Sequence, residues 1–345
     1  ISTSPSTYGG NLVFGSTSVL TAPSFAFASA GDLTMNGQMH ASAGGIQLSA
    51  GRYHNSGIGY STPAGGNVLI GGNIDAVSGS IGIAANVGYM SGGNGNITQN
   101  AGSNISTVNG SINIEGGGNV TLNGSTSAYG GNGSIRSGFA DFTGSTPYGG
   151  NITLGGDVYG ANGLGLYAGS GGTGTVGNGH ILQNGGSLAS NSTIVLYADG
   201  NIGLQGRVET PGSLYIYAGL NNGSTFGSPS AQSVYGGDIG FGADSAIYGS
   251  HVALIANRGT GGGGLGNIRQ EAGGQITITG VTSFYAYAAG NLDLLGRLRV
   301  AASSTVSLQA GYYYPGGAAQ QFADKHATVS DLDAGGGNVD IDATG

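Results

Sequence analysis

The feature that most constrains the fold of this chain is an eight-residue segment that recurs three times at nearly equal intervals. The copies are GNITQNAG, GHILQNGG and GNIRQEAG, and their second residues are Asn96, His180 and Asn267. These residues lie 84 and 87 positions apart (180 − 96 and 267 − 180). A fixed internal period is the signature of repeat architectures, in which similar units stack along one axis. We therefore expect a stacked repeat fold.

Three further landmarks recur in the same order around each copy. The second landmark is GDLTMNG, GNVTLNG, GNIGLQG and GNLDLLG; the third is AGGNVLIGG, YGGNITLGG, YGGDIGFGA and GGGNVDIDA; the fourth is SIGIAAN, LGLYAGS and HVALIAN. They divide one continuous solenoid over residues 1–345 into super-repeats of about 85 residues. Their approximate ranges are 1–95, 96–179, 180–266 and 267–345. The last block stops after its third landmark, so we expect a piece of a longer array.

Short segments with apolar residues two positions apart predict β-strands within each landmark. In Asn119-Val120-Thr121-Leu122 the valine and leucine share one face of a strand and the threonine lies on the other. Four landmarks in a block give about 21 residues per unit, which is too short for a βαβ crossover but fits one coil of a parallel β-solenoid. The sequence thus predicts an all-β parallel β-helix of about 16 coils, one for each landmark.

Composition supports stacked strands and excludes several function classes. The chain has 76 glycines, only 7% charged residues and no cysteine, which disfavours helices, disulfides and thiolate metal sites. Stacked Val, Ile and Leu would fill the interior, stacked Asn would bond amide to amide at corners, and stacked like charges would repel. The formal charge of −8 without a basic run disfavours nucleic acid as a partner, and no apolar run is long enough for a membrane span.

A stretch of variable length separates the second and third landmarks of each block. Insertions at one fixed phase of a repeat lie on one side of a solenoid, which is often its binding side. These stretches are polar and aromatic, and their aromatic residues are candidate contacts, although they could instead cover the shaft beneath their own loops. The candidates are Tyr53, Tyr60, Phe139, Phe142, Phe226, Tyr235, Tyr312, Tyr313, Tyr314 and Phe322.

The combination of G-N-(I/V/L)-x-(L/I) strands, I-x-Q-x-(A/G)-G elements and variable block length resembles the repeat region of filamentous haemagglutinin-like exoproteins of two-partner secretion. The resemblance covers essentially the whole chain. It implies a right-handed β-helix that is exported through an outer-membrane transporter and displayed on, or shed from, the bacterial cell surface. Right-handed winding is also the general preference of parallel crossovers. The Asn-Pro-Asn motifs of the family's secretion domain are absent, so we expect the central shaft.

Signals of catalysis or metal binding are weak. The densest acidic group is Asp331, Asp333, Asp340 and Asp342, four oxygen donors that make a weak calcium candidate against the alternative of a solvated surface. The five histidines are scattered without metal-ligand spacing, and the glycine-rich runs are not followed by the Lys-Ser/Thr of a phosphate loop. The sequence therefore predicts no enzyme and no cofactor.

These observations favour a structural and adhesive shaft of a secreted bacterial surface protein, a rigid rod that displays loops for attachment. Its expected partners are a host or neighbouring-cell surface, glycans, or other copies of itself. One alternative is a self-assembling extracellular filament subunit that stacks end to end, because open sheet edges invite pairing. A carbohydrate-active β-helix is the least favoured alternative.

Overall fold

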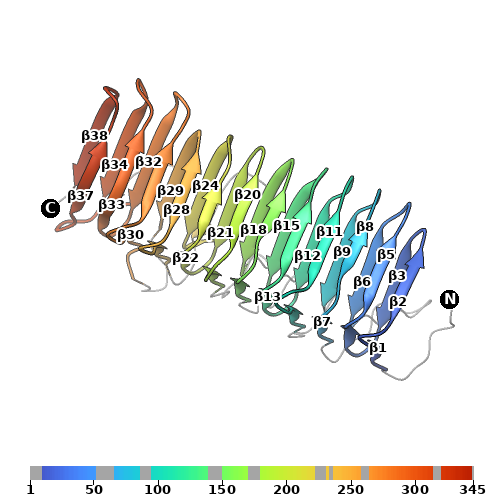
Figure 1. Ribbon diagram of the computed structural model, residues 1–345. Helices are drawn as coiled ribbons and strands as arrows, with labels where there is room; N and C mark the ends of the chain where they lie inside the picture. The colour runs from blue at the N-terminus through green and yellow to red at the C-terminus, as the bar shows by residue number, and fades with distance from the viewer. Residues whose placement is uncertain are drawn as a thin grey trace.

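Every regular element in the described part of the chain is a β-strand, and most of the strands form three parallel columns along one rod (Figure 1). The structure is a computed structural model that describes residues 10–51, 66–85, 95–138, 150–169, 179–221, 231–232, 236–257, 264–313 and 320–343. Each coil contributes one segment to each column, and the chain then rises to the next coil. This arrangement is a parallel β-solenoid.

The first column begins each coil, and its strands are three residues long until the last two coils. Its members are β1 (Leu12–Phe14), β4 (Leu33–Met35), β7 (Val68–Ile70), β10 (Ile97–Gln99), β13 (Val120–Leu122), β16 (Ile152–Leu154), β19 (Ile181–Gln183), β22 (Ile202–Leu204), β27 (Ile239–Phe241), β30 (Ile268–Gln270), β33 (Leu292–Val300) and β37 (Ala327–Asp333).

The second column follows after a tight corner and belongs to the same 22-stranded sheet, because β33 and β37 run through both columns. Its other members are β2 (Val19–Ala22), β5 (Gln38–Ala41), β8 (Ile74–Ala76), β11 (Asn104–Thr107), β14 (Ser125–Ala128), β17 (Val158–Gly160), β20 (Ser187–Ser190), β23 (Arg207–Glu209), β28 (Ala246–Gly249) and β31 (Gln275–Ile278).

The third column is a separate sheet of twelve strands. Its members are β3 (Phe25–Ser29), β6 (Ile46–Ala50), β9 (Ile81–Ala85), β12 (Ile112–Gly116), β15 (Asn132–Ser137), β18 (Gly163–Ala168), β21 (Ile194–Ala198), β24 (Ser213–Ala218), β29 (His251–Ala256), β32 (Ser283–Ala288), β34 (Thr305–Ala310) and β38 (Asn338–Ala343). Two short antiparallel hairpins extend from this column: β25 (Leu220–Asn221) with β26 (Ala231–Gln232), and β35 (Tyr312–Tyr313) with β36 (Gln320–Gln321).

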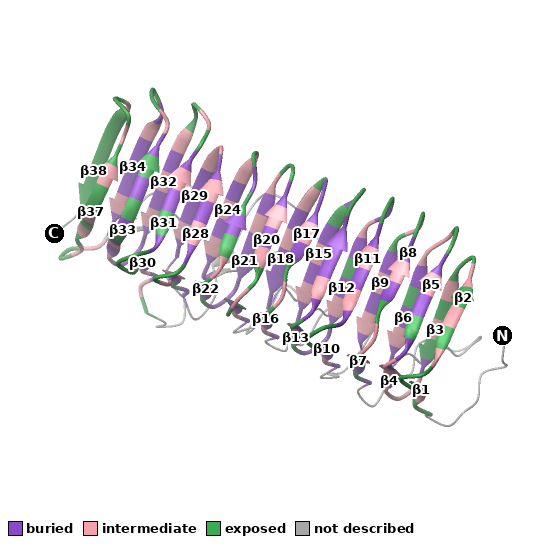
Figure 2. Cartoon of the chain, in the orientation of Figure 1, coloured by how far each residue is buried: buried purple, intermediate pink, exposed green. Residues whose placement is uncertain are grey.

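Alternating burial explains why these short strands are stable in this arrangement. In the first column Ile97, Val120, Ile152 and Ile181 stand in register and are fully buried. Burying one such side chain contributes about 1.5–3 kcal/mol relative to leaving it exposed. Inward positions of all three columns repeat this pattern and form one continuous core along the rod (Figure 2).

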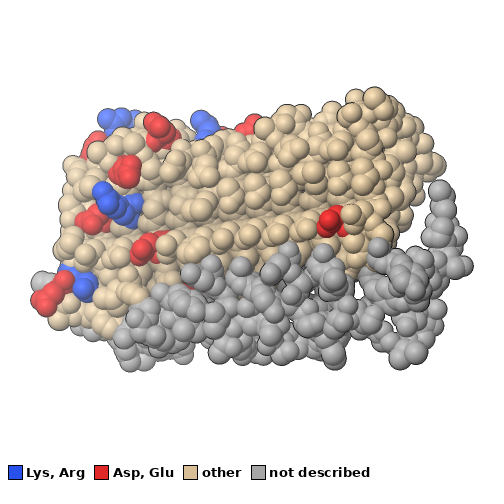
Figure 3. All heavy atoms as spheres, turned by 90° about the horizontal axis from the view of Figure 1, so that it is seen from below, with Lys and Arg blue, Asp and Glu red and all other residues tan. Residues whose placement is uncertain are grey.

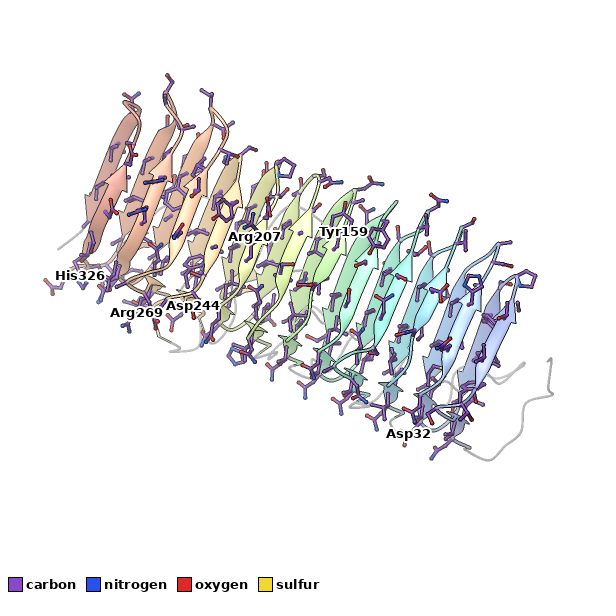
Figure 4. All side chains as sticks on the ribbon, viewed as in Figure 1. Asp32, Tyr159, Arg207, Asp244, Arg269 and His326 are labelled. Atoms are coloured by element: carbon purple, nitrogen blue, oxygen red, sulfur yellow. The ribbon has the colours of Figure 1, made fainter. Side chains whose placement is uncertain are left out.

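A row of polar side chains, here called the corner ladder, ties each coil to the next just before the first column. In every rung a side-chain oxygen or ring nitrogen accepts the backbone N–H of the next member, with donor–acceptor distances of 2.7–3.4 Å. Two of its members, Asp32 and His326, are labelled near opposite ends of the rod in Figure 4. The members are Asn11, Asp32, Asn67, Asn96, Asn119, Asn151, His180, Asn201, Asp238, Asn267, Asn291 and His326.

The expected amide-to-amide bonds are therefore mostly side chain-to-backbone bonds. Direct side-chain bonds occur in addition at some rungs, as between Asn96 Nδ2 and Asn67 Oδ1 at 3.3 Å. The corner ladder thus gives a side-chain acceptor to the backbone N–H just before each first-column strand from β4 onward.

The sequence steps along the corner ladder identify the repeat. Successive members are 21, 35, 29, 23, 32, 29, 21, 37, 29, 24 and 35 residues apart. A short coil, a long coil and a coil of 29 residues thus recur in this order. Three such coils together make up the super-repeat of about 85 residues seen in the sequence.

The expectation of one coil for each landmark is wrong. The fourth landmark, for example SIGIAAN, forms third-column strand β9 in the same coil as the third landmark, which forms β7. The described residues accordingly build twelve third-column strands, fewer than the about 16 coils expected from a uniform unit. GGGNVDIDA was also assigned to the wrong position, because it forms β38 in the third column. The first-column strand of that coil begins after His326, in β37.

The recurring GNITQNAG segment forms the short coil's corner between the first and second columns. Gln99, Gln183 and Gln270 occupy inward positions that are Leu, Ile, Met, Phe or Val in the other coils. The Nε2 of each donates to a carbonyl of its own turn and to one of the next coil. Each turn also contains a glycine with positive φ, such as Gly102 at 80°. The glutamine thus replaces apolar packing with a hydrogen-bonded turn in three of the four short coils, while the first short coil has Phe14 at this position.

Candidate binding surfaces

The undescribed internal segments all interrupt the solenoid at one corner. They lie within residues 52–65, 86–94, 139–149, 170–178, 222–235, 258–263 and 314–319, and each follows a third-column strand and precedes a first-column strand. The strands that flank them meet along one edge of the rod (Figure 1). Two of the segments have hairpins, β25–β26 and β35–β36, at their bases.

Glycine pairs form narrow necks at the described bases of four of these segments, which lie within 52–65, 139–149, 170–178 and 222–235. A Cβ atom placed on Gly179 would lie 2.3 Å from the backbone nitrogen of Gly169, and one placed on Gly150 would lie 2.3 Å from that of Gly138. Any larger side chain at these positions would clash with backbone on the other side of the neck. The described residues on the two sides of each of these segments consequently adjoin in space.

Most of the aromatic residues predicted as contacts lie outside the described residues: Tyr53, Tyr60, Phe139, Phe142, Phe226, Tyr235 and Tyr314. Tyr312 and Tyr313 form β35, whose backbone alone is described. Phe322 is half-buried at the base of its insertion, where its N–H donates to Gly311 O at 2.8 Å. The contact role of these residues stays a prediction.

The structure does not bring the four aspartates of the weak calcium candidate into one group. Asp331 and Asp333 lie on β37 in the second column, whereas Asp340 and Asp342 lie on β38 in the third. Asp331 Oδ2 accepts from Arg297 Nε at 3.1 Å, and Asp333 Oδ1 accepts from the Gly335 N–H at 3.2 Å. Within the described ranges, no three His, Cys, Asp or Glu side chains are grouped closely enough to hold a metal ion.

The outward face of the third column carries an aromatic row that the sequence reasoning missed. Tyr167, Tyr197 and Tyr217 stand in register on β18, β21 and β24, with ring centroids 5.8 and 4.8 Å apart and nearly parallel planes. The row continues through further contacts of 5.6–6.1 Å between centroids. We call this set the tyrosine strip: Tyr167, Tyr197, Tyr215, Tyr217, His251, Tyr285 and Tyr287.

Burial gives the tyrosine strip its chemical character. Tyr167 and Tyr197 are only 3% and 6% exposed although they point away from the core, and the Tyr167 ring lies over Gly165 of its own strand. Burial raises the pKa of Tyr167 to about 12, while the nearby Arg136 guanidinium opposes this shift. Burial likewise raises the pKa values of Tyr197 and Tyr217. The phenols of Tyr167, Tyr197 and Tyr217 are therefore neutral over the physiological pH range.

On the face seen in Figure 3, most of the charged side chains lie toward the C-terminal half of the rod. Arg207 Nε lies 2.7 Å from Glu209 Oε2, and its guanidinium also covers the Tyr248 ring at 4.6 Å. Arg207 projects from the second column, as does Tyr159 (Figure 4). The pair of Arg207 and Glu209 lies within one strand, whereas His40 contacts Asp75 and Arg297 contacts Asp331 on the next coil. Arg297 and Asp331 are thus stacked charges of opposite sign, which avoids the repulsion expected of like charges.

One carboxyl group is buried beside an insertion neck. Asp199 follows β21, is 4% exposed, and its Oδ2 would lie 2.9 Å from a Cβ placed on Gly169. Desolvation by burial raises the pKa of Asp199 from 3.8 to about 8. The side chain is therefore mostly protonated at neutral pH.

Searches against known protein families, curated proteins and solved structures found no match. The class of the molecule consequently follows from its own geometry, which is that of a parallel β-solenoid with insertions at one corner. In the part of the chain that the structure describes, no helix has the length and apolarity to cross a bilayer.

Proposed function

We propose that this chain is the structural and adhesive shaft of a secreted bacterial surface protein. The rod provides reach and stiffness, and the insertions along one corner contact a host cell, a neighbouring cell or glycans. The proposal is non-enzymatic, and it includes right-handed winding of the coils. Export through an outer-membrane transporter belongs to the same proposal and rests on the resemblance to filamentous haemagglutinin-like exoproteins.

The observation that supports this function best is the common position of the insertions. Seven separate segments interrupt the chain, and all depart after a third-column strand. A rod that only had to be long would need no insertions, and insertions placed for stability would be spread over all three corners. Concentration at one corner arrays them along a single edge, which favours multivalent contact with a surface.

The glycine necks make a direct test possible. Residues 139–149 can be removed by joining Gly138 to Gly150, because these residues already meet at the neck. The same excision at each insertion gives a bare rod. We expect the bare rod to keep its β-sheet circular dichroism and its thermal unfolding midpoint within a few degrees, but to lose attachment to cells.

The control is Asp244→Asn, a substitution of an exposed residue on the rod in a chain that keeps all its insertions. This variant should attach to cells as the parent does. Attachment of the bare rod at the parent level would contradict the proposal. Long continuous filaments in electron micrographs of the parent protein would favour the self-assembling alternative, and polysaccharide cleavage that depends on one carboxylate would favour the enzymatic one.

A further inference from the structure

His180 is a corner-ladder member that accepts the next backbone N–H through a ring nitrogen rather than an oxygen. Asn201 N donates to His180 Nδ1 at 2.9 Å, while the His180 N–H donates to Asn151 Oδ1 at 2.9 Å. An imidazole nitrogen accepts a hydrogen bond only when it carries no proton. The rung therefore requires the neutral tautomer with its proton on Nε2.

The surroundings of His180 also favour the neutral ring. Burial is the cause that lowers the pKa of the half-buried His180 below its ordinary value. The coil below carries Asp157, which accepts from Ser187, and the buried Asp199 lies at the end of His180's own coil. The coil above carries Arg207, which is paired with Glu209. Asp238 lies one rung beyond Asn201. No ion pair joins His180 to any of these groups in the described residues.

We propose that His180 makes the junction between the coils of β19 and β22 a pH-operated weak point of the rod. When Nδ1 takes up a proton from water, imidazole and the Asn201 N–H both become donors and face each other at hydrogen-bond distance. The Asn201 N–H then loses its acceptor, and the cationic ring moves toward solvent. The corner opens there, while neighbouring rungs with asparagine acceptors stay closed.

The direction of the pH dependence follows from linkage. A base whose folded pKa lies below its unfolded value contributes stability that is fully present above the unfolded pKa of 6.5. That contribution is lost as the pH falls through the lowered folded pKa. Mild acid therefore weakens this junction.

His326 provides an internal contrast within the corner ladder. Its backbone N–H is a donor to Asn291 Oδ1, but its ring bonds elsewhere, with Nε2 lying 3.1 Å from Asp293 Oδ1. A protonated ring would keep that contact as an ion pair. The weak point thus depends on the ring nitrogen's role as an acceptor and not on histidine at a ladder position.

Hydrogen exchange of individual backbone amides tests the proposal in the intact chain. The protection factor, which corrects for the intrinsic pH dependence of exchange, is measured at about pH 7 and about pH 4.5. We expect protection of the Asn201 amide to fall roughly tenfold or more in acid. The Asn119 and Asn151 amides, whose acceptors are asparagine oxygens, should change by less than about twofold. The Asn267 amide, whose acceptor is Asp238, reports any carboxylate protonation over the same range.

His180→Asn installs the acceptor used by the other rungs and should abolish the acid loss at Asn201. A loss that persists in H180N, or no loss in the parent, would overturn the proposal. The ¹⁵N chemical shifts of the parent's His180 ring give a second readout that needs no variant. At neutral pH they should report an unprotonated Nδ1, and a protonated Nδ1 would equally refute the assignment.

Discussion

Gln99 Nε2 donates to Ser125 O of the next coil at 2.9 Å, and Gln99 Oε1 accepts from Thr126 Oγ1 at 3.1 Å. The equivalent glutamines keep the first interaction but lack the second, because Val208 and Leu298 occupy the position of Thr126. Gln183 Oε1 and Gln270 Oε1 are consequently buried without a hydrogen-bond partner.

This difference predicts opposite effects of two substitutions. Thr126→Val should lower the free energy of unfolding by about 1–3 kcal/mol, because it leaves Gln99 Oε1 buried without this hydrogen-bond donor. Val208→Thr should be neutral or stabilising, because it offers Gln183 Oε1 the missing donor. Chemical denaturation of both variants checks the pair. A destabilisation by Val208→Thr as large as that by Thr126→Val would contradict this explanation.

Removing the buried carboxylate beside the neck should change the pH dependence of stability. Asp199 keeps its proton in the folded chain up to about pH 8, whereas the unfolded chain releases it near 3.8. Its contribution to stability is therefore present below 3.8 and is lost as the pH rises through about 8. Asp199→Asn should match the parent in strong acid and exceed its stability at pH 8 by at least about 1.4 kcal/mol, the equivalent of one pKa unit. Thermal unfolding across this range tests the expectation, and exposed Asp244→Asn is the control.

Close stacking of coils makes some glycines irreplaceable and others optional. A Cβ atom on Gly72 would lie 1.7 Å from the backbone oxygen of Gly37, whereas one on Gly240 meets nothing within 4 Å. Gly72→Ala should destabilise the rod by several kcal/mol because backbone must shift in two coils. Gly240→Ala should be neutral or slightly stabilising, since glycine weakens a strand interior. Equal unfolding midpoints for the two variants would be incompatible with the observed stacking.

The tyrosine strip should contribute to stability through its ring contacts. Tyr197 lies between Tyr167 and Tyr217, so Tyr197→Ala removes two stacked pairs and a buried side chain. We expect a loss of about 2–4 kcal/mol, measured by denaturant unfolding. Tyr129→Ala is the comparison, because Tyr129 is 59% exposed and should cost less than about 1 kcal/mol. Indistinguishable losses would show that stacking in the strip is not stabilising.

Alternation predicted the strands that carry large apolar residues, and the structure confirms an all-β parallel architecture. NVTL contains β13 and QITI forms β31. β31 belongs to the second column, but the sequence did not show that every coil has a strand there, because most members, such as Ser125–Ala128, are too short and polar to stand out. Without that column, a landmark on the third face was counted as a coil of its own.

The tyrosine strip could not be predicted for a related reason. Tyr167, Tyr197 and Tyr217 are 30 and 20 residues apart (197 − 167 and 217 − 197), so their register depends on coil lengths that the insertions vary. A recurring signal was nevertheless present, since LYA, LYA, IYA and AYA each close a third-column strand. The sequence predicted variable stretches at one phase of the repeat, between the second and third landmarks. Further undescribed segments follow β9, β18 and β29 at the same corner of the rod.

The glycine necks allow the insertions to change in sequence and length during evolution independently of the shaft. Since each insertion starts and finishes at adjoining backbone positions, doubling its length costs only about 0.6 kcal/mol of closure entropy and displaces no coil. Mutation can therefore lengthen, shorten or replace an insertion without changing how the coils pack. Selection for a different outer surface can therefore act on seven separate segments while the stacked coils of the shaft stay the same.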